Sequence, residues 1–254
     1  MTQAMKGWIL SSLARISMSL GDDLFRRALT TVLGRRLKRM SPKAALRFLL
    51  VLDNDLYALQ GTSAVRYGGG VHPKHRLTGY HDFFVSRLRE GERVLDVGCG
   101  AGELAWDMAE RANVEVVAMD LDPQKISQAK RLRPHPRVLY RQGDVLEGCP
   151  EGSYDVVVLS NVLEHLEART GFLRGLREST RAARFLVRVP LYDRDWRVPL
   201  KRELGLDHRL DPTHVVEYTR EGFLAEMEEA GLEVREMELR WGEIWAEAVP
   251  RGLG

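Results

Sequence analysis

Apolar residues recur through the first part of the chain with the period of a helix. Five of them lie about 3.6 residues apart, as one helix face requires: Trp8, Ile9, Leu13, Ile16 and Leu20. A second helix is predicted from Asp22 to Leu33, ending at Gly34. Ser41-Pro42 gives the capping signal of a third helix that runs to about Leu59. The three glycines at 68–70 then break the pattern, so residues 1–70 are predicted to form a helical extension.

After residue 70, short apolar runs alternate with helical segments, which is the pattern of an α/β fold. The runs predicted as strands are 94–97, 114–119, 137–141, 153–161, 185–190, 233–239 and 244–249. Helices are predicted over 103–112, after the capping signal Asp122-Pro123, and over 219–230. The last two strands alternate apolar and polar residues around the turn at 240–243, so we expect them to form a closing antiparallel pair.

A glycine-rich turn follows the first of these strands. Asp96 precedes Gly98, Gly100 and Gly102, which stand at alternate positions just before a predicted helix. Glycine tolerates positive φ and has no Cβ, so such a turn lets backbone approach a ligand closely, and the helix N-terminus offers unpaired N–H groups. The dinucleotide fingerprint would need its third glycine at Glu103. A carboxylate at Asp96 would also repel a pyrophosphate, whereas it would suit a cofactor that carries an ammonium and a sulfonium.

The run from Val94 to Gly102 resembles motif I of the class I S-adenosylmethionine-dependent methyltransferases. Later segments fit that family in order and distance. Asp120 stands about 20 residues past the turn, where an acid would hold ribose hydroxyls. In the family, the acid matching Asp144 sits beside the adenine amino group, and the segment 162–166 (Val-Leu-Glu-His-Leu) resembles small-molecule members. Together with the segments 72–76 (HPKHR) and 240–247 (RWGEIWAE), it resembles methyltransferases encoded with bacterial surface-polysaccharide enzymes.

The resemblance covers about residues 72–250 and implies the fold, the domains and the cofactor. The fold expected is an α/β, Rossmann-like, doubly wound sheet of seven strands with the last strand antiparallel, spanning residues 71–254 after the helical extension 1–70. The cofactor expected is S-adenosyl-L-methionine. The residues expected to contact it are Arg76, Tyr80, Asp96, Gly98, Cys99, Gly100, Gly102, Asp120, Leu121, Asp144, Val145 and Asn161.

The segment 71–84 holds His72, His75 and His81 together with Arg76 and Tyr80. The resemblance implies that this segment folds over the methionine end of the cofactor. Metal binding by the three histidines is the competing interpretation, but no acid or cysteine completes a convincing ligand set, so no metal site is predicted. Cys99 is interpreted as a small apolar filler, because nothing nearby in the sequence indicates a lowered thiol pKa.

Methyl transfer to a hydroxyl needs a group that removes the hydroxyl proton, and histidine titrates in a useful range. His165 lies just beyond the fourth strand, near the expected position of the methyl group, and is the first candidate base. His214, at the end of a long insertion after the fifth strand (191–214), is the second. Either imidazole could instead have a structural role, and Glu164 could orient a neighbour or face solvent.

The insertion mixes aromatic residues with Asp and Arg, which suits a polyhydroxylated or charged acceptor.

Three functions remain open at this stage. The leading prediction is O-methylation of a sugar hydroxyl on a nucleotide-, lipid- or glycan-linked acceptor. A quinone or other small-molecule O-methyltransferase is the first alternative, and a non-catalytic cofactor-binding subunit is the second, which the intact motif I disfavours. Methylation of nucleic-acid bases is not expected, because the segment 160–164 lacks the Asn-Pro-Pro-Tyr type of motif on which a base stacks.

Composition bounds the remaining possibilities. The 254 residues include 44% hydrophobic and 29% charged residues, as in ordinary soluble globular proteins, and Cys99 and Cys149 form no disulfide framework or zinc spacing. This cysteine usage predicts a reducing cytoplasm as the location. No apolar stretch approaches the roughly 18 residues that a membrane-spanning helix needs. The net charge is only +2, yet residues 1–50 hold ten Lys or Arg against Asp22 and Asp23. This basic arm is expected to be a solvated face or to contact an anionic partner, such as the inner membrane face, RNA or a phosphorylated substrate. The oligomeric state is left open.

Overall fold

The computed structural model describes residues 3–148 and 152–252. The chain divides into two compact units, Met1–Leu56 and Tyr57–Gly254. Cys149, which the sequence analysis considers as a free cysteine, lies outside the described residues, and so do the side chains of Ile9, Leu13 and Ile16. Each unit is described by itself below.

The first unit is helical, as the sequence predicts. It contains α1 (Gln3–Ser19), α2 (Asp22–Leu37) and the first part of α3 (Pro42–Tyr67). The prediction that the second helix ends at Gly34 is wrong, because an interior glycine costs a helix only about 1 kcal/mol and the residues after it continue the turn. The third helix also runs further than predicted, to the residue before Gly68.

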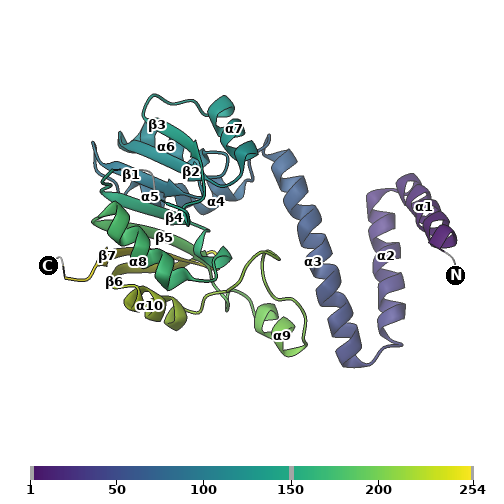
Figure 1. Ribbon diagram of the computed structural model, residues 1–254. Coiled ribbons are helices and arrows are strands. Elements are labelled where there is room, and N and C mark those ends of the chain that lie inside the picture. The colour runs from purple at the N-terminus through teal and green to yellow at the C-terminus, as the bar shows by residue number, and fades with distance from the viewer. Residues whose placement is uncertain (1–2, 149–151, 253–254) are drawn as a thin grey trace. The chain divides into compact units, whose positions relative to one another are not determined.

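The second unit contains one sheet. Within the described residues, seven strands lie in the order β3-β2-β1-β4-β5-β7-β6 (Figure 1). Pairing is parallel from β3 through to β5, and β7 runs antiparallel to both of its neighbours. This confirms the predicted doubly wound seven-stranded sheet with an antiparallel last strand. The strands are β1 (Arg93–Val97), β2 (Glu115–Asp120), β3 (Val138–Gln142), β4 (Val156–Ser160), β5 (Arg184–Pro190), β6 (Leu232–Arg240) and β7 (Glu243–Pro250).

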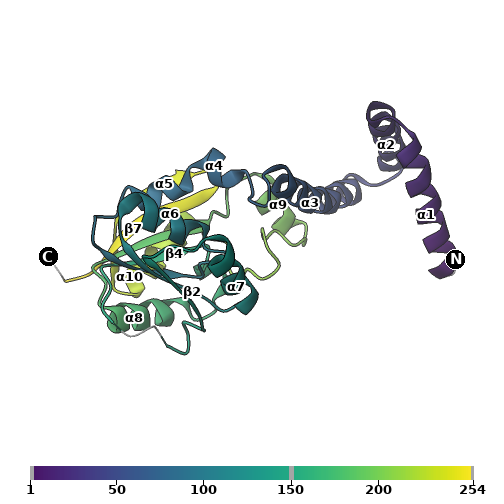
Figure 2. The same ribbon diagram turned by 90° about the horizontal axis from the view of Figure 1, so that it is seen from above.

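Helices cover both faces of the sheet (Figure 2). One apolar core lies between the sheet and the helices α5, α6 and α7, and the other lies between the sheet and α8 and α10. Successive strand residues alternate between the two cores, as Val94 and Leu95 of β1 do. The helices of this unit are α4 (Lys74–Thr78), α5 (Tyr80–Val85), α6 (Glu103–Ala112), α7 (Pro123–Leu132), the 3₁₀ helix η1 (Leu163–His165), α8 (Arg169–Thr180), α9 (Arg197–Glu203) and α10 (Arg220–Glu229).

Local signals in the sequence determine several of the boundaries. The Asp122 side chain accepts a hydrogen bond of 2.7 Å from the Gln124 N–H at the start of α7, which is the predicted cap. Thr219 caps α10 in the same way. The turn between β6 and β7 has positive φ at both Trp241 and Gly242, the geometry that matches the twist of a tight hairpin.

Among the described residues, none of the helices combines the length and the apolar character that a membrane span requires. The first unit nevertheless leaves apolar side chains uncovered on α2, including Phe25, Leu29 and Val32. The same helix carries Arg35 and Arg36 in its last turn. An apolar surface bordered by cations is the combination with which peripheral helices bind anionic membranes.

We therefore expect the 254-residue chain to bind vesicles that contain anionic lipid. Replacing Arg35 and Arg36 by Gln should weaken that binding by about 30-fold, because each cation near an anionic surface contributes roughly 1 kcal/mol. Sedimentation with phosphatidylserine-containing vesicles measures this effect. The double variant Lys130→Gln/Arg131→Gln, on α7, is the matched control. Equal binding to neutral vesicles, or equal loss in both double variants, would rule out a membrane role for this arm.

Candidate active site

The glycine turn between β1 and α6 has positive φ at each predicted glycine: 70° at Gly98, 56° at Gly100 and 81° at Gly102. A Cβ at Gly98 would come within 2.8 Å of the Val162 side chain, and one at Gly102 would come within 2.7 Å of the Tyr140 ring. At Gly100 a Cβ would meet no atom within 4 Å. Packing thus requires the outer two glycines, whereas the middle one leaves bare backbone facing open space, as a cradle for a ligand needs.

Asp120, at the end of β2, holds this turn in place. Its carboxylate accepts hydrogen bonds from the Gly100 N–H at 2.8 Å and the Asp122 N–H at 2.9 Å. The Met119 carbonyl next to it accepts the N–H groups of Gly98 and Cys99. A carboxylate has about four lone-pair sites, so Asp120 retains acceptor capacity for the ribose hydroxyls that the sequence assigns to it.

Asp96 is a buried carboxylate that lacks a full set of partners. Its side chain is 1% exposed, and within the described part of the chain its Oδ2 atom accepts no hydrogen bond. Burial, and then repulsion from Asp120, raise the pKa of Asp96 to about 8. A ligand cation would relieve both effects. The ammonium group of S-adenosylmethionine is such a cation, so this turn and its two acids fit that cofactor.

The other residues predicted to contact the cofactor lie along the same edge of the sheet. Asn161, directly after β4, adopts a positive φ of 59°, and its buried Oδ1 has no partner among the described residues. Leu121 leaves an apolar side chain 65% exposed after β2. Asp144 is half-buried and caps the turn to Leu146, and Val145 packs against the core. A strained backbone, an unpartnered amide oxygen and an uncovered apolar side chain at one edge are features of a ligand site.

The segment before β1 lies beside this turn. Arg76 is exposed and lines a cavity of about 410 Å³ together with Glu103, the residue after the last glycine of the turn. Tyr80 is buried, and its ring lies 3.9 Å from the guanidinium carbon of Arg188. Burial raises the pKa of the Cys99 thiol well above its usual range, as expected of an apolar filler.

Hydrogen bonds to neighbouring groups involve all three histidines of this segment. His81 Nδ1 lies 2.6 Å from the Asp107 carboxylate, His75 contacts both His81 and the Tyr80 hydroxyl, and His72 accepts the Lys74 N–H. These contacts form a hydrogen-bonded chain that fixes α4 and α5 on α6. The role of Arg76 and Tyr80 toward the cofactor stays a prediction.

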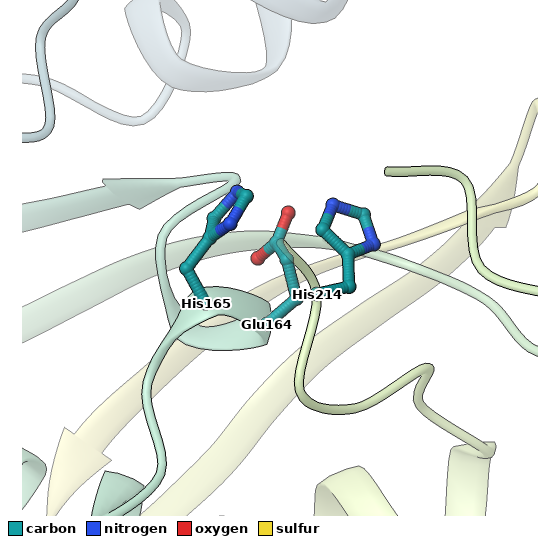
Figure 3. Close-up of side chains that lie close together, drawn as sticks. All are labelled: Glu164, His165 and His214. Carbon is teal, nitrogen blue, oxygen red and sulfur yellow. The ribbon is translucent and has the colours of Figure 1, made fainter. Parts of the chain in front are cut away.

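Glu164, His165 and His214 form a second cluster at the carboxyl end of β4, and Figure 3 shows the Glu164 carboxylate between the two imidazoles. The two rings lie 4.7 Å apart between centroids. The Val215 N–H donates to the Glu164 carbonyl at 2.7 Å, so a backbone hydrogen bond holds the insertion against η1. The sequence predicts both histidines as separate candidates, and the structure brings them together.

The sequence allows two roles for Glu164, an orienting group or a solvent-facing one. The solvent-facing alternative is wrong. The side chain is fully buried, and burial raises its pKa to about 7. His165 is exposed, and burial of part of its ring, followed by repulsion from His214, lowers its pKa. The apolar neighbours Leu163 and Leu166 are the signal that could have indicated burial of the segment.

Hydrogen bonds determine which imidazole nitrogens carry a proton. The Thr213 hydroxyl donates to Asp211 at 2.6 Å, so its oxygen accepts from His165 Nδ1 at 2.9 Å. His214 Nδ1 lies 2.9 Å from the Glu217 carboxylate, which can only accept, and Glu217 also pairs with Arg194. In both histidines Nδ1 therefore carries a proton, so Nε2 is the nitrogen that has the lone pair whenever the ring is neutral.

The insertion after β5 also carries aromatic and cationic side chains. It contains α9 and returns to the sheet where the Tyr192 N–H donates to the Tyr218 carbonyl. Tyr192 packs against His208, with Arg202 near its ring, and Trp196 is 68% exposed. Exposed aromatic and cationic side chains are typical of a surface that receives a ligand.

Comparison with known proteins identifies the family. A family model described as a methyltransferase domain matches residues 72–237. The chain therefore belongs to this family and carries a class I S-adenosylmethionine-dependent methyltransferase domain.

Among solved structures, a glycopeptide N-methyltransferase complexed with S-adenosylmethionine superposes with a TM-score of 0.53 and 22% identity, over 69% of this chain and 87% of that one. A putative methyltransferase in complex with the Trm112 activator of Haloferax volcanii gives a TM-score of 0.59 and 14% identity, over 72% and 93%. At these identities the likeness shows the fold.

Curated relatives share sequence over a shorter region. The ribosomal protein L11 methyltransferase of Thermotoga petrophila is 34% identical over 117 residues, which is 45% of this chain and 43% of that protein. The enzyme of the same name from Burkholderia orbicola is 32% identical over 113 residues, or 44% and 36%. The chain thus spans less than half the length of these relatives. The predicted likeness to small-molecule members stays a prediction.

Asp120→Ala should weaken S-adenosylmethionine binding by about 1–3 kcal/mol, because it removes charge-assisted hydrogen bonds to the ribose and the support of the turn. Isothermal titration calorimetry measures the change. Asp122→Ala is the matched control, since that acid lies two residues away but caps α7. Unchanged affinity in the Asp120 variant would contradict the assignment.

Asp96→Asn should stabilise the cofactor-free protein while it weakens cofactor binding. The raised pKa of Asp96 means that the folded state keeps the proton between about pH 4 and pH 8, whereas the unfolded state releases it. The stability of the wild type should therefore fall over that window, and the variant should not share this fall. Thermal melts at pH 5 and pH 8 test this, with a larger gain in Tm expected at pH 8. A pH-independent difference would be evidence against a buried, protonated Asp96.

Proposed function

We propose that this chain transfers the methyl group of S-adenosylmethionine to a hydroxyl oxygen, in the first instance a sugar hydroxyl on a nucleotide-, lipid- or glycan-linked acceptor. The observation that carries the proposal is the pair His165 and His214 at the carboxyl end of β4, each with its Nδ1 held by a hydrogen bond so that Nε2 is left as the basic nitrogen of the neutral ring. When bound, the cofactor supplies an electrophilic methyl group. The residues of the chain then have to align the acceptor, exclude water and take up its proton.

His165 is the group proposed to take the proton. Its imidazole is exposed, so an acceptor can reach it, and its Nδ1–H is held by Thr213, so the ring presents the basic Nε2. Its lowered pKa keeps the ring neutral near pH 7. An amine acceptor that arrives as an ammonium would also need a base, so the acceptor screen below includes ribosomal proteins, which carry amino groups.

The insertion supports a polyhydroxylated acceptor. Trp196 and Tyr192 offer aromatic surfaces on which the apolar face of a sugar ring can pack, and Arg202 offers a cation for an acidic or phosphorylated group. This surface begins at the end of β5, the edge at which ligands of doubly wound sheets bind. We further propose a cytoplasmic location, with the basic arm in peripheral contact with the inner membrane face.

A protein acceptor is the second candidate, favoured by the similarity to ribosomal protein L11 methyltransferases. That similarity covers less than half of this chain, and it need not extend to the insertion. A quinol is a third acceptor worth including in the same screen.

His165→Ala should lower turnover by about 10²–10⁴-fold and leave the affinity for S-adenosylmethionine nearly unchanged, because the imidazole acts on the acceptor. Transfer of tritiated methyl from the cofactor to sugar nucleotides, glycolipids, quinols and ribosomal proteins measures the activity. His135→Ala, a histidine paired with Glu110 beside β3, is the control. Methylation of ribosomal proteins alone would replace the sugar proposal, and full activity of the His165 variant would refute its role as base.

A further inference from the structure

The cluster of Glu164, His165 and His214 offers more lone pairs than proton removal needs. One ligand atom from each residue lies within 4.8 Å of the other two. A general base uses a single unprotonated nitrogen, and here two are presented together with a carboxylate. Three such donor atoms close together favour a positive charge between Glu164, His165 and His214.

Glu164 provides the independent observation. Its side chain is fully buried, and within the described residues neither of its oxygens has a hydrogen-bond partner. A buried carboxylate without partners is costly, and buried charges in proteins are paired or coordinate metals. Because both neighbouring histidines carry their proton on Nδ1, toward Thr213 and Glu217, neither imidazole donates to Glu164 in this arrangement.

We propose that Glu164, His165 and His214 bind a divalent first-row cation such as Zn²⁺ or Mn²⁺. Two imidazoles and one carboxylate with an open position form a donor set of catalytic zinc and related sites. Bond lengths of about 2.0–2.2 Å require the donor atoms to approach one another more closely than 4.8 Å, and a rotation of the exposed His165 side chain can provide this. The exposed side of His165 leaves the remaining coordination positions accessible.

The surroundings of the two histidines suit this role. Metal-bound imidazoles usually donate their other N–H to a carboxylate or hydroxyl, which fixes ring orientation and raises basicity. His214 has Glu217 for this purpose, and Glu217 is itself held by Arg194 and the Leu210 N–H. His165 has Thr213, which is held by Asp211.

The role of the cation rests on the proposed O-methylation and changes one part of it: the His165 Nε2, proposed above as the base, holds the cation, and the cation acidifies the acceptor hydroxyl. The acceptor hydroxyl binds the cation, its O–H bond breaks, and the proton passes to solvent on the open side of His165. The oxygen then forms a bond to the methyl carbon as the carbon–sulfur bond of the cofactor breaks. The sulfonium becomes a neutral thioether, so one proton is released for each methyl group transferred.

Binding of Co²⁺ to the metal-stripped full-length protein tests the site without any acceptor. One equivalent should bind and give a visible d–d absorption band. His214→Gln and Glu164→Gln should each weaken binding by about 100-fold or more, and Glu217→Gln by about 10–100-fold, because it removes only the orienting partner. His135→Gln, which alters another histidine paired with a glutamate, should bind as the wild type does. Binding of S-adenosylmethionine checks that each variant is folded.

Failure of the site and failure of the proposed function give different results. Absence of Co²⁺ binding, or equal binding in the His214 and His135 variants, would overturn the metal site whatever the acceptor. If Co²⁺ binds as expected, methyl transfer should be lost with a chelator and restored by Zn²⁺ or Mn²⁺. Transfer that continues at full rate in the chelator would overturn the catalytic role of the cation. A confirmed site in a protein that methylates no hydroxyl would refute the proposed function alone.

Discussion

The hydrogen bond from the Gly100 N–H to the Asp120 carboxylate is the interaction on which the cofactor edge depends. The glycine turn has no side chains with which to hold itself, so its shape comes from contacts with the neighbouring strand. Because β1 and β2 are adjacent and parallel, their carboxyl ends lie side by side, and an acid at the end of one can reach the turn after the other. The pKa of Asp96 on β1 is raised first by burial and then by the negative charge of Asp120.

Two carboxylates at this edge are buried without a full set of partners in the described structure, Asp96 after the middle of β1 and Glu164 after β4. Both have a raised pKa for the same first reason, which is burial. Each of these buried carboxylates destabilises the ligand-free fold, and a cation bound beside it would reverse that destabilisation. Sites that bind ligands often carry such local destabilisation.

The sequence predicts the fold well because the fold follows from local patterns. Apolar runs, glycine turns and caps such as Asp122 each act over a few residues. The strands predicted at 114–119, 137–141 and 185–190 and the helix predicted at 219–230 appear within one residue of the expected positions. A prediction is wrong where the local signal is weak. The helix predicted to end at Gly34 continues to Leu37, because one glycine destabilises a helix too little to end it. Local patterns cannot predict that Glu164 and His214 lie together. In the sequence 49 residues lie between them, and their proximity depends on how the insertion folds back. The burial of Glu164 likewise depends on that return.

The hydrogen bond between the Val215 N–H and the Glu164 carbonyl joins the end of the insertion to η1 through backbone atoms alone. Side chains at 164 and 214 can therefore change in evolution while the geometry that juxtaposes them is kept. A substitution there alters which groups meet the acceptor, and it leaves the path of the chain intact. Related chains could in this way exchange one kind of acceptor chemistry for another by two point mutations, without rebuilding a loop.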